Sequence, residues 1–160
     1  MYSLLLGEIE KELDPISNTK QALQRVCDLI HSEMSAYDWV GFYFMHHGSR
    51  KLHLGPYVGA PTDHTIIDFG KGICGQVAES GNSFLVDDVN AQSNYIACSI
   101  DVKSEIVVPL YQNGNLIAQI DIDSHQLKRF QAEDEKFLKA VNDLLARKYP
   151  ELENFIDQLV

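Results

Sequence analysis

The 160-residue chain is poor in cysteine, with only Cys27, Cys74 and Cys98. Three is an odd number and the spacing is wide, so a framework of structural disulfides is not expected. The same spacing matches none of the usual zinc-ligand patterns. We therefore expect a reducing, cytoplasmic location, and neither a metal nor another cofactor.

Basic residues and long apolar runs are also scarce. Acidic residues outnumber basic ones 23 to 13, and the resulting net charge of -10 argues against nucleic acid or an anionic membrane as the main partner. No stretch approaches the roughly 18 consecutive apolar residues of a membrane span. The segment after Met1 has neither a basic start nor a long apolar run, so no secretory signal is expected. A full P-loop and a G-x-G-x-x-G motif are both lacking, which leaves only weak support for phosphate binding.

The composition that is present is typical of a globular protein. Hydrophobic residues make up 45% and charged residues 22%, and the length suits one domain, residues 1–160, with its own core. The apolar spacing of the second helix places Cys27 in the core. Helices are expected over residues 3–13, from a cap at Ser17 or Asn18 to Met34, from the Gly70–Gly75 turn through Glu79, over 131–148 and over 151–160.

Between the second and the last long helix, β-prone segments alternate with turns. The longest irregular segment covers residues 87–102 and contains Cys98, and loops of this length are often functional. The order of elements predicts an α+β fold in which helices cover a central antiparallel sheet of about six strands. Strands are expected over residues 39–45, 51–54, 65–69, 84–86, 104–111 and 115–123.

The last two strands form a hairpin around Asn113-Gly114, and its register decides where three acids point. A two-residue loop in a regular ladder would mix polar and apolar side chains on both faces. A three-residue loop, residues 112–114, instead gives one wholly apolar face, with Glu105 opposite Asp121 and Asp123 on the same side. We therefore predict the second register. Its apolar pairs are Ile106 with Ile120, Val108 with Ala118, and Leu110 with Leu116.

The predicted acidic face has two readings. The acids are either solvated surface groups or ligands for a cation, because like charges side by side repel unless they are neutralised. A substrate ammonium group and a hard metal ion are the two candidates for that cation. Trp39, Gly41 and Tyr43 share one face of their own strand, and the alternation does not say whether it is the acidic face.

Local physics favours Cys74 over Cys98 as a reactive thiol. Cys74 follows a Gly-x-Gly turn near a helix N-terminus, where free N–H groups stabilise a thiolate. The alternative is a small buried residue at a close helix–sheet contact, marked by Gly72 and Gly75. Cys98 has only Lys103 as a basic neighbour in sequence.

A set of motifs in order resembles the GAF-type free methionine-(R)-sulfoxide reductases over about residues 20–147. The motifs are Trp39-Val-Gly-Phe-Tyr43, Leu54-Gly-Pro-Tyr57, Gly70-Lys-Gly-Ile-Cys-Gly75, Tyr95-Ile-Ala-Cys98, Ser104-Glu-Ile-Val-Val-Pro-Leu110 and Asp121-Ile-Asp-Ser124. Each piece is weak alone, whereas the ordered set is specific.

This resemblance implies a GAF fold, a dimer, and reduction of the free amino acid with thioredoxin as electron donor. It implies that Cys98 is the nucleophile, in place of Cys74, and that Cys98 passes through a sulfenic acid. Either Glu105 or Asp121 would protonate the departing oxygen. It also implies a substrate-binding set: Trp39, Tyr43, Glu105, Asp121 and Asp123.

The chain departs from the family pattern in one functional position. His64 stands ten residues before Cys74, where family members often carry the cysteine that resolves the sulfenic acid. Tyr95 and Ser99 also stand where His and Asp are common beside the catalytic cysteine. Either Cys74 resolves Cys98, which we prefer, or thioredoxin attacks the sulfenic acid directly.

Two rival functions remain open at the level of the sequence. A non-catalytic GAF module that senses a small ligand is the first. The cyclic-nucleotide type is disfavoured, because Phe130–Glu135 fits half of its signature but no Asn-Lys dipeptide is present. A metal-binding protein using Glu105, Asp121 and Asp123 is the second.

Overall fold

The computed structural model describes residues 1–95 and 101–160 of the chain. Its α-helices are α1 (Tyr2–Leu13), α2 (Thr19–Glu33), α3 (Gly72–Ser80) and α4 (Ala132–Lys148), with 3-10 helices η1 (Val89–Ala91) and η2 (Pro150–Gln158). Its strands are β1 (Trp39–His46), β2 (Lys51–Val58), β3 (Ile66–Asp68), β4 (Phe84–Val86), β5 (Ser104–Gln112) and β6 (Asn115–Ser124).

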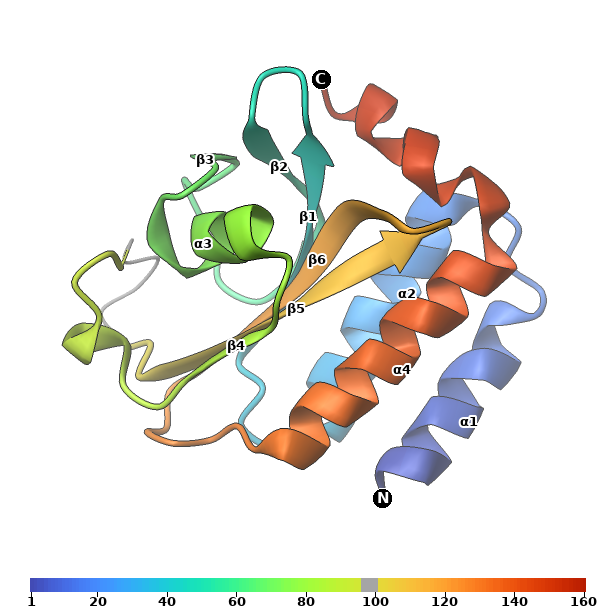
Figure 1. Cartoon of the computed structure of the whole chain (residues 1–160). Coiled ribbons are helices and arrows are strands. Elements are labelled where there is room, and N and C mark those ends of the chain that lie inside the picture. Colours follow the sequence, from blue (N-terminus) through green and yellow to red (C-terminus); the bar gives the residue numbers. More distant parts are fainter. Residues whose placement is uncertain (96–100) are drawn as a thin grey trace.

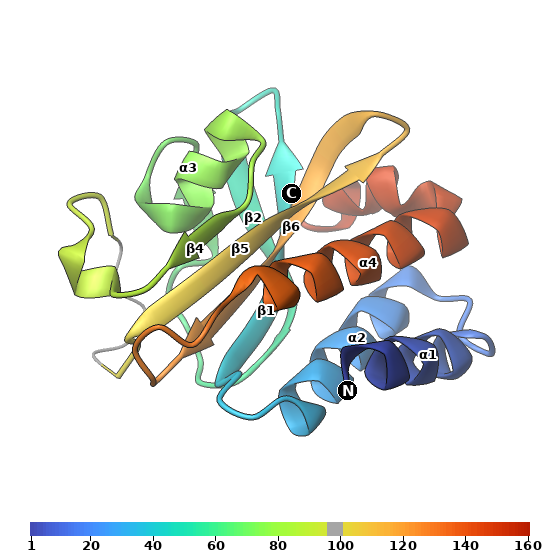
Figure 2. The same ribbon diagram turned by 60° about the horizontal axis from the view of Figure 1, so that its bottom comes forward.

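The six strands form one antiparallel sheet in the order β3-β2-β1-β6-β5-β4. Helices α1, α2 and α4 lie on one side of this sheet, and α3 lies on the other (Figures 1 and 2). The predicted α+β fold, with a central antiparallel sheet flanked by helices, is therefore confirmed. No helix in the described ranges combines the length and the apolar character that crossing a membrane requires.

The main core fills the space between the sheet and α1, α2 and α4. It takes Val26, Cys27 and Ile30 from the apolar stripe of α2, so the prediction that Cys27 is a core residue is confirmed. Asn18 caps this helix, because its side chain accepts a hydrogen bond from the backbone N–H of Gln21 at 2.9 Å. A smaller core lies on the opposite side of the sheet, under α3.

The predicted register of the β5–β6 hairpin is wrong. Gln112 pairs with Asn115, so the loop has two residues, and both Asn113 and Gly114 have positive φ, as a type I′ turn requires. Beyond the turn the pairing shifts between Leu110 and Tyr111, which leaves Ile117 as the extra residue of a β-bulge.

The bulge moves every later pair by one residue relative to a regular two-residue hairpin. Ile106 therefore faces Ile122 and Glu105 faces Asp123, whereas the predicted three-residue loop pairs them with Ile120 and Asp121. The observed register differs from the predicted one by two residues, and a shift of two keeps each side chain on its face. Leu116, before the bulge, packs against the smaller core instead of beside Leu110.

Strand β2 is four residues longer than predicted and runs through Pro56. A second register shift between Gly41 and Tyr43 of β1 accommodates this proline, which has no N–H to donate to the ladder. At the other end of the chain, α4 begins one residue after Gln131. Gln131 and Asp134 form a capping box there, with each side chain bonded to the other's backbone.

Candidate functional site

The three acids lie on the side of the sheet that faces α3. Glu105 and Asp121 border a small cavity beside Cys74, and Asp123 borders a larger one beside Trp39. Strand β1 supplies the aromatic neighbours, because Trp39 pairs with Asp123 and Gly41 pairs with Asp121. The question that the sequence left open is answered: the aromatic face of β1 and the acidic face of β6 are the same face.

These acids are buried, which rules out the reading in which they are solvated surface groups. Glu105 is 6% exposed, and Asp121 and Asp123 are each 3% exposed. Burial raises the pKa of Asp121, and it raises the pKa of Asp123 well above its ordinary value with a further contribution from the charge of Asp121. Hydrogen bonding with Glu105 opposes both rises only in part. The cluster can therefore retain a proton at a pH where isolated carboxyls are ionised.

Not every oxygen of this cluster is satisfied. Within the described part of the chain, Oδ1 of Asp121 and Oδ1 of Asp123 are buried and have no hydrogen-bond partner. An unpaired buried carboxylate oxygen costs free energy unless a ligand or a proton compensates it. Such a cluster is suited to binding a cation or to transferring a proton.

Cys74 lies against two of the acids. Its thiol donates to Oδ2 of Asp121 at 3.3 Å and is 4.0 Å from Oε2 of Glu105. The pKa of Cys74 is raised well above its ordinary value, first by burial and then by the charges of Asp121 and Glu105. The hypothesis that the helix N-terminus activates Cys74 as a thiolate is therefore wrong, because burial and the acids outweigh the helix dipole.

Cys74 is held in place by the sheet below it. The side-chain amide of Gln119, on β6, donates to the backbone carbonyl of Cys74 at 3.2 Å. A cavity of about 20 Å³ adjoins the thiol and is also lined by His64, Tyr43 and Lys71. His64, at the position where relatives often carry a cysteine, thus lies at the same cavity as the thiol and the acids.

Trp39 forms the aromatic wall of the site. Its indole N–H donates to the carbonyl of Ala60 at 3.1 Å, and its ring stacks on Tyr57 at 5.3 Å between centroids. The ring lies over Gly41, where an added Cβ would be 2.4 Å from the Trp39 ring. Tyr43, also a predicted substrate-binding residue, lies at the thiol end of the site, and its hydroxyl donates to the carbonyl of His64 at 2.8 Å.

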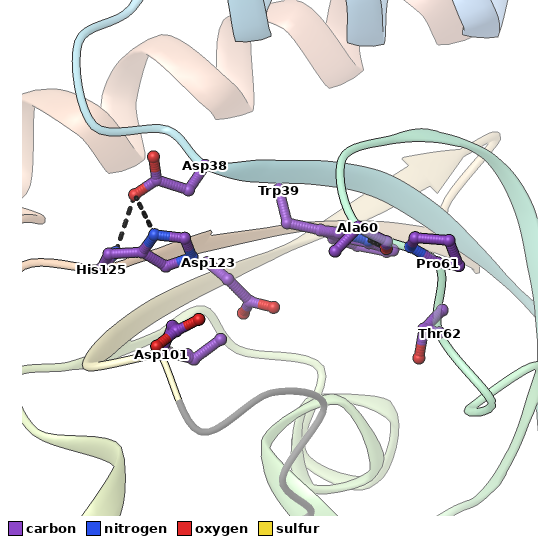
Figure 3. A pocket seen from close by; sticks show the side chains of 9 residues that line it. Asp38, Trp39, Ala60, Pro61, Thr62, Asp101, Asp123 and His125 are labelled. Atoms are coloured by element: carbon purple, nitrogen blue, oxygen red, sulfur yellow. Dashed lines mark hydrogen bonds and ion pairs between the residues drawn. The ribbon is translucent and has the colours of Figure 1, made fainter.

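A cavity of about 120 Å³ opens between Trp39 and Asp123. Trp39 and the Ala60–Thr62 loop lie on one side of it, and Asp38, Asp101, Asp123 and His125 lie on the other (Figure 3). The backbone N–H of His125 donates to Oδ2 of Asp38 at 2.7 Å, and Nδ1 of His125 is 3.8 Å from the same oxygen.

The sequence analysis missed four polar residues of this cavity: Asp38, Thr62, Asp101 and His125. Two of them could have been found from their position next to a motif in the sequence, because Asp38 directly precedes Trp39 and His125 directly follows the Asp-Ile-Asp-Ser motif. Asp101 lies in the long segment, residues 87–102, that the sequence marks as functional only as a whole, and no pattern in the sequence indicates Thr62.

Cys98, the predicted nucleophile, lies outside the described residues. The nearest described residues before and after it, Tyr95 and Asp101, both lie on the side of the sheet that carries the three acids. Tyr95 packs against the smaller core and Asp101 lines the cavity beside Asp123. Asn94 is fixed at the start of α3, because its side chain accepts from the N–H of Gly72 at 3.1 Å and donates to the carbonyl of Gly70 at 2.7 Å.

The GAF domain family model matches residues 17–147, which is most of the chain and includes every strand. The chain belongs to the GAF domain family. The predicted resemblance to free methionine-(R)-sulfoxide reductases is also confirmed. The chain is 32% identical to the solved free methionine-R-sulfoxide reductase of Neisseria meningitidis in complex with its substrate, with a TM-score of 0.88 over 97% of this chain and 91% of that one.

Curated relatives extend the comparison. Free methionine-R-sulfoxide reductase of Saccharomyces cerevisiae is 38% identical over 110 residues, which cover 68% of this chain and 61% of that protein. Protein YtsP of Bacillus subtilis is 35% identical over 150 residues, covering 91% of this chain and 89% of that one. The relatives thus support a reductase role at the level of the family.

Proposed function

We propose that this protein reduces free methionine-(R)-sulfoxide to methionine, with Cys98 as the nucleophile and thioredoxin as the electron donor. The observation that carries the proposal is the cluster of buried acids with unpaired oxygens, Asp121 and Asp123, beside the aromatic wall at Trp39. The solved reductase of Neisseria meningitidis, bound to its substrate, shares the fold over nearly the whole chain. Protection against oxidative damage to methionine is the role that follows.

The free amino acid matches the chemistry of the site. The substrate ammonium neutralises the repulsion among Glu105, Asp121 and Asp123, and the S-methyl end packs against Trp39, with Tyr43 at the thiol end. A methionine sulfoxide within a peptide has an acylated, uncharged nitrogen, so it leaves the carboxylates unpaired. The site therefore selects the free amino acid over peptides.

The reaction balances with the groups that the chain supplies. The Cys98 thiolate attacks the sulfoxide sulfur and forms a sulfur–sulfur bond, and Glu105 or Asp121 delivers a proton to the sulfoxide oxygen. The resulting hydroxyl passes from the substrate sulfur to the Cys98 sulfur as the sulfur–sulfur bond breaks, so methionine leaves and Cys98 becomes a sulfenic acid. Two thiols of the donor then restore Cys98 as they form a disulfide and release water.

Reduction of the Cys98 sulfenic acid back to the thiol is the step at which this chain differs from the family pattern. We retain Cys74 as the proposed resolving thiol. Because the pKa of Cys74 is raised by burial and by the acids, its attack on the sulfenic acid requires a base, and Asp121, 3.3 Å from the thiol, is placed to accept the proton. Direct attack by thioredoxin is the alternative, and His64 in place of a cysteine leaves both routes open.

Three broader expectations belong to the same proposal. Residues 1–160 form a single GAF domain, which is supported by the packing of α1 and η2 into the main core that α2 and α4 also share. The protein works in the cytoplasm, where thioredoxin keeps thiols reduced, and it forms a homodimer, as the family resemblance implies.

A non-catalytic GAF module that senses a small ligand is the rival function.

A stereospecific turnover assay tests the proposal. The purified protein should consume free methionine-(R)-sulfoxide with dithiothreitol or thioredoxin, and should leave the S epimer and N-acetylmethionine sulfoxide unreacted. Cys98→Ser should abolish the activity, whereas Cys74→Ser should keep a single turnover and lose thioredoxin-linked cycling. Full turnover by Cys98→Ser would refute the assignment of the nucleophile, and ligand binding without turnover by the native protein would favour the sensor.

A further inference from the structure

Cys74, Glu105 and Asp121 together have the composition of a transition-metal site. Each offers one donor atom, and these three atoms all lie within 4.8 Å of one another. The set contains one sulfur and two oxygens and is buried, whereas sites for calcium and magnesium use oxygen ligands. A thiolate with carboxylates suits a borderline ion such as Zn²⁺.

The separations of the Cys74 sulfur from the two oxygens are close to those of tetrahedral coordination. Zinc bonds of about 2.3 Å to sulfur and 2.0 Å to oxygen, at tetrahedral angles, place sulfur and oxygen about 3.5 Å apart. Sγ of Cys74 is 3.3 Å from Oδ2 of Asp121 and 4.0 Å from Oε2 of Glu105. Both sulfur–oxygen separations are therefore within about half an ångström of the tetrahedral value, and all three donor atoms lie within 4.8 Å of one another.

Two further observations point to a ligand at this cluster. Asp121 is 3% exposed, and its Oδ1 is buried without a hydrogen-bond partner among the described residues. The adjoining cavity of about 20 Å³ has room for one water, which would complete the tetrahedron. Asp121 therefore has a buried oxygen that a metal ion would satisfy, directly or through that water.

We infer that the chain has a Zn²⁺-binding site formed by Cys74, Glu105 and Asp121, with water as the fourth ligand. The ion replaces the thiol proton and relieves the repulsion between the two acids. The basic side chains of the cavity lining, among the described residues, are His64 and Lys71, and Lys71 is exposed to solvent. If the proposed function holds, Zn²⁺ competes with the substrate ammonium and inhibits the enzyme reversibly.

Direct binding tests the inference without reference to catalysis. Zn²⁺ is titrated calorimetrically into the full-length protein reduced with a non-thiol phosphine, and Co²⁺ serves as the spectroscopic probe. We expect one equivalent of Zn²⁺ and a thiolate-to-cobalt charge-transfer band. Cys74→Ser should abolish the band and weaken Zn²⁺ binding by at least about 10-fold, since even residues that only support ligands are worth 10–100-fold.

Three variants make the outcome decisive. Cys27→Ala, which removes the thiol in the main core, and Cys98→Ser should both keep the metal and the band, while Asp121→Asn should weaken the binding. Thermal unfolding with and without Zn²⁺ shows whether each variant is folded, and a folded Cys74→Ser protein should lose the metal-induced rise in Tm. Zn²⁺ binding that survives Cys74→Ser, or that is lost instead in His46→Ala at the end of β1, would overturn the inference.

Discussion

Asp134 and Asp121 are both buried acids on opposite sides of the sheet, Asp134 on helix α4 and Asp121 on strand β6, and their surroundings differ. Asp134 is 1% exposed, and both of its oxygens are hydrogen-bonded: Oδ1 accepts from Tyr37 at 2.5 Å, and Oδ2 accepts from the backbone N–H of Gln131 at 2.8 Å. The guanidinium of Arg129 lies 3.4 Å from Oδ1 and stacks over the ring of Tyr37. This acid is a structural element that joins the start of α4 to the segment before β1.

The acids of the other face have no comparable set of partners. Asp121 has the Cys74 thiol and Glu105 as neighbours, and Asp121 and Asp123 each keep one buried oxygen without a partner among the described residues. The comparison teaches that burial alone does not mark a functional acid. What marks it is burial together with unsatisfied oxygens at a cavity.

The largest expected effect on activity comes from neutralising an acid of the functional face. Asp121→Asn keeps the shape but removes a charge and a proton acceptor, so we expect kcat/KM for free methionine-(R)-sulfoxide to fall by about 100-fold or more, roughly 2.7 kcal/mol. The free energy of unfolding should not fall, because the native protein carries the cost of desolvating this group. Steady-state kinetics and urea denaturation measure the two quantities, and a loss of stability without loss of activity would break the comparison.

The reverse pattern is expected at Asp134. Asp134→Ala leaves the buried Tyr37 hydroxyl unpaired and removes the cap of α4, so the free energy of unfolding should fall by about 2–4 kcal/mol. Activity per folded molecule should stay within about twofold of the native value. Asp143→Ala is the matched control, since Asp143 is an exposed acid on the same helix, paired with Lys139, and its effect should be within about 0.5 kcal/mol. A catalytic defect in folded Asp134→Ala would contradict the division of roles.

Gly41→Ala tests the aromatic wall without changing any charge. The added methyl group would lie 2.4 Å from the Trp39 ring and 2.8 Å from Cβ of Tyr57, so the indole has to move. We expect KM to rise by about 10-fold, together with a loss in stability of about 1–3 kcal/mol. Gly7→Ala, on α1 with no atom within 4 Å of the added carbon, should leave the kinetics unchanged, and an unchanged KM in Gly41→Ala would remove Trp39 from the binding site.

The pH dependence of stability gives the smallest expected effect. Burial raises the pKa of Asp123 in the folded protein, so the folded state holds a proton that the unfolded state releases from about pH 4 upward. Stability is therefore lost as the pH rises from about 4 toward the folded pKa. The difference in the free energy of unfolding between Asp123→Asn and the native protein should grow in favour of Asp123→Asn by on the order of 1 kcal/mol from pH 4.5 to pH 7.5. Urea denaturation at both pH values measures this gain, and Asp143→Asn should show none.

Much of the fold follows from local patterns in the sequence. The apolar stripe of α2, the cap at Asn18 and the alternation of β6 from Ala118 to Asp123 each predicted the right element, because each depends on residues close together in the chain. The hairpin register was predicted wrongly, because the prediction assumed a regular ladder and the structure has a bulge at Ile117. The acids nevertheless keep their common face, because the error was an even number of residues.

The environment of the site was harder to predict than its residues. The helix-dipole argument for Cys74 failed because the burial of this thiol and its contact with Asp121 depend on how α3 packs against β5 and β6. Asp101 and Thr62 reach the cavity from segments far apart in the chain. Such proximity is a property of the tertiary structure, and a single sequence contains no signal for it.

Binding of the substrate to a variant that cannot turn it over tests the central claim most directly. Free methionine-(R)-sulfoxide is titrated calorimetrically into the Cys98→Ser protein and into Cys98→Ser proteins that also carry Asp123→Asn or Asp134→Asn, one acid from each side of the sheet. We expect Asp123→Asn to weaken binding by about 100-fold, because a buried charge loses its partner, and Asp134→Asn to leave it unchanged. Equal affinities in the Asp123→Asn variant and its Cys98→Ser parent would contradict the claim that the acids of this face hold the substrate.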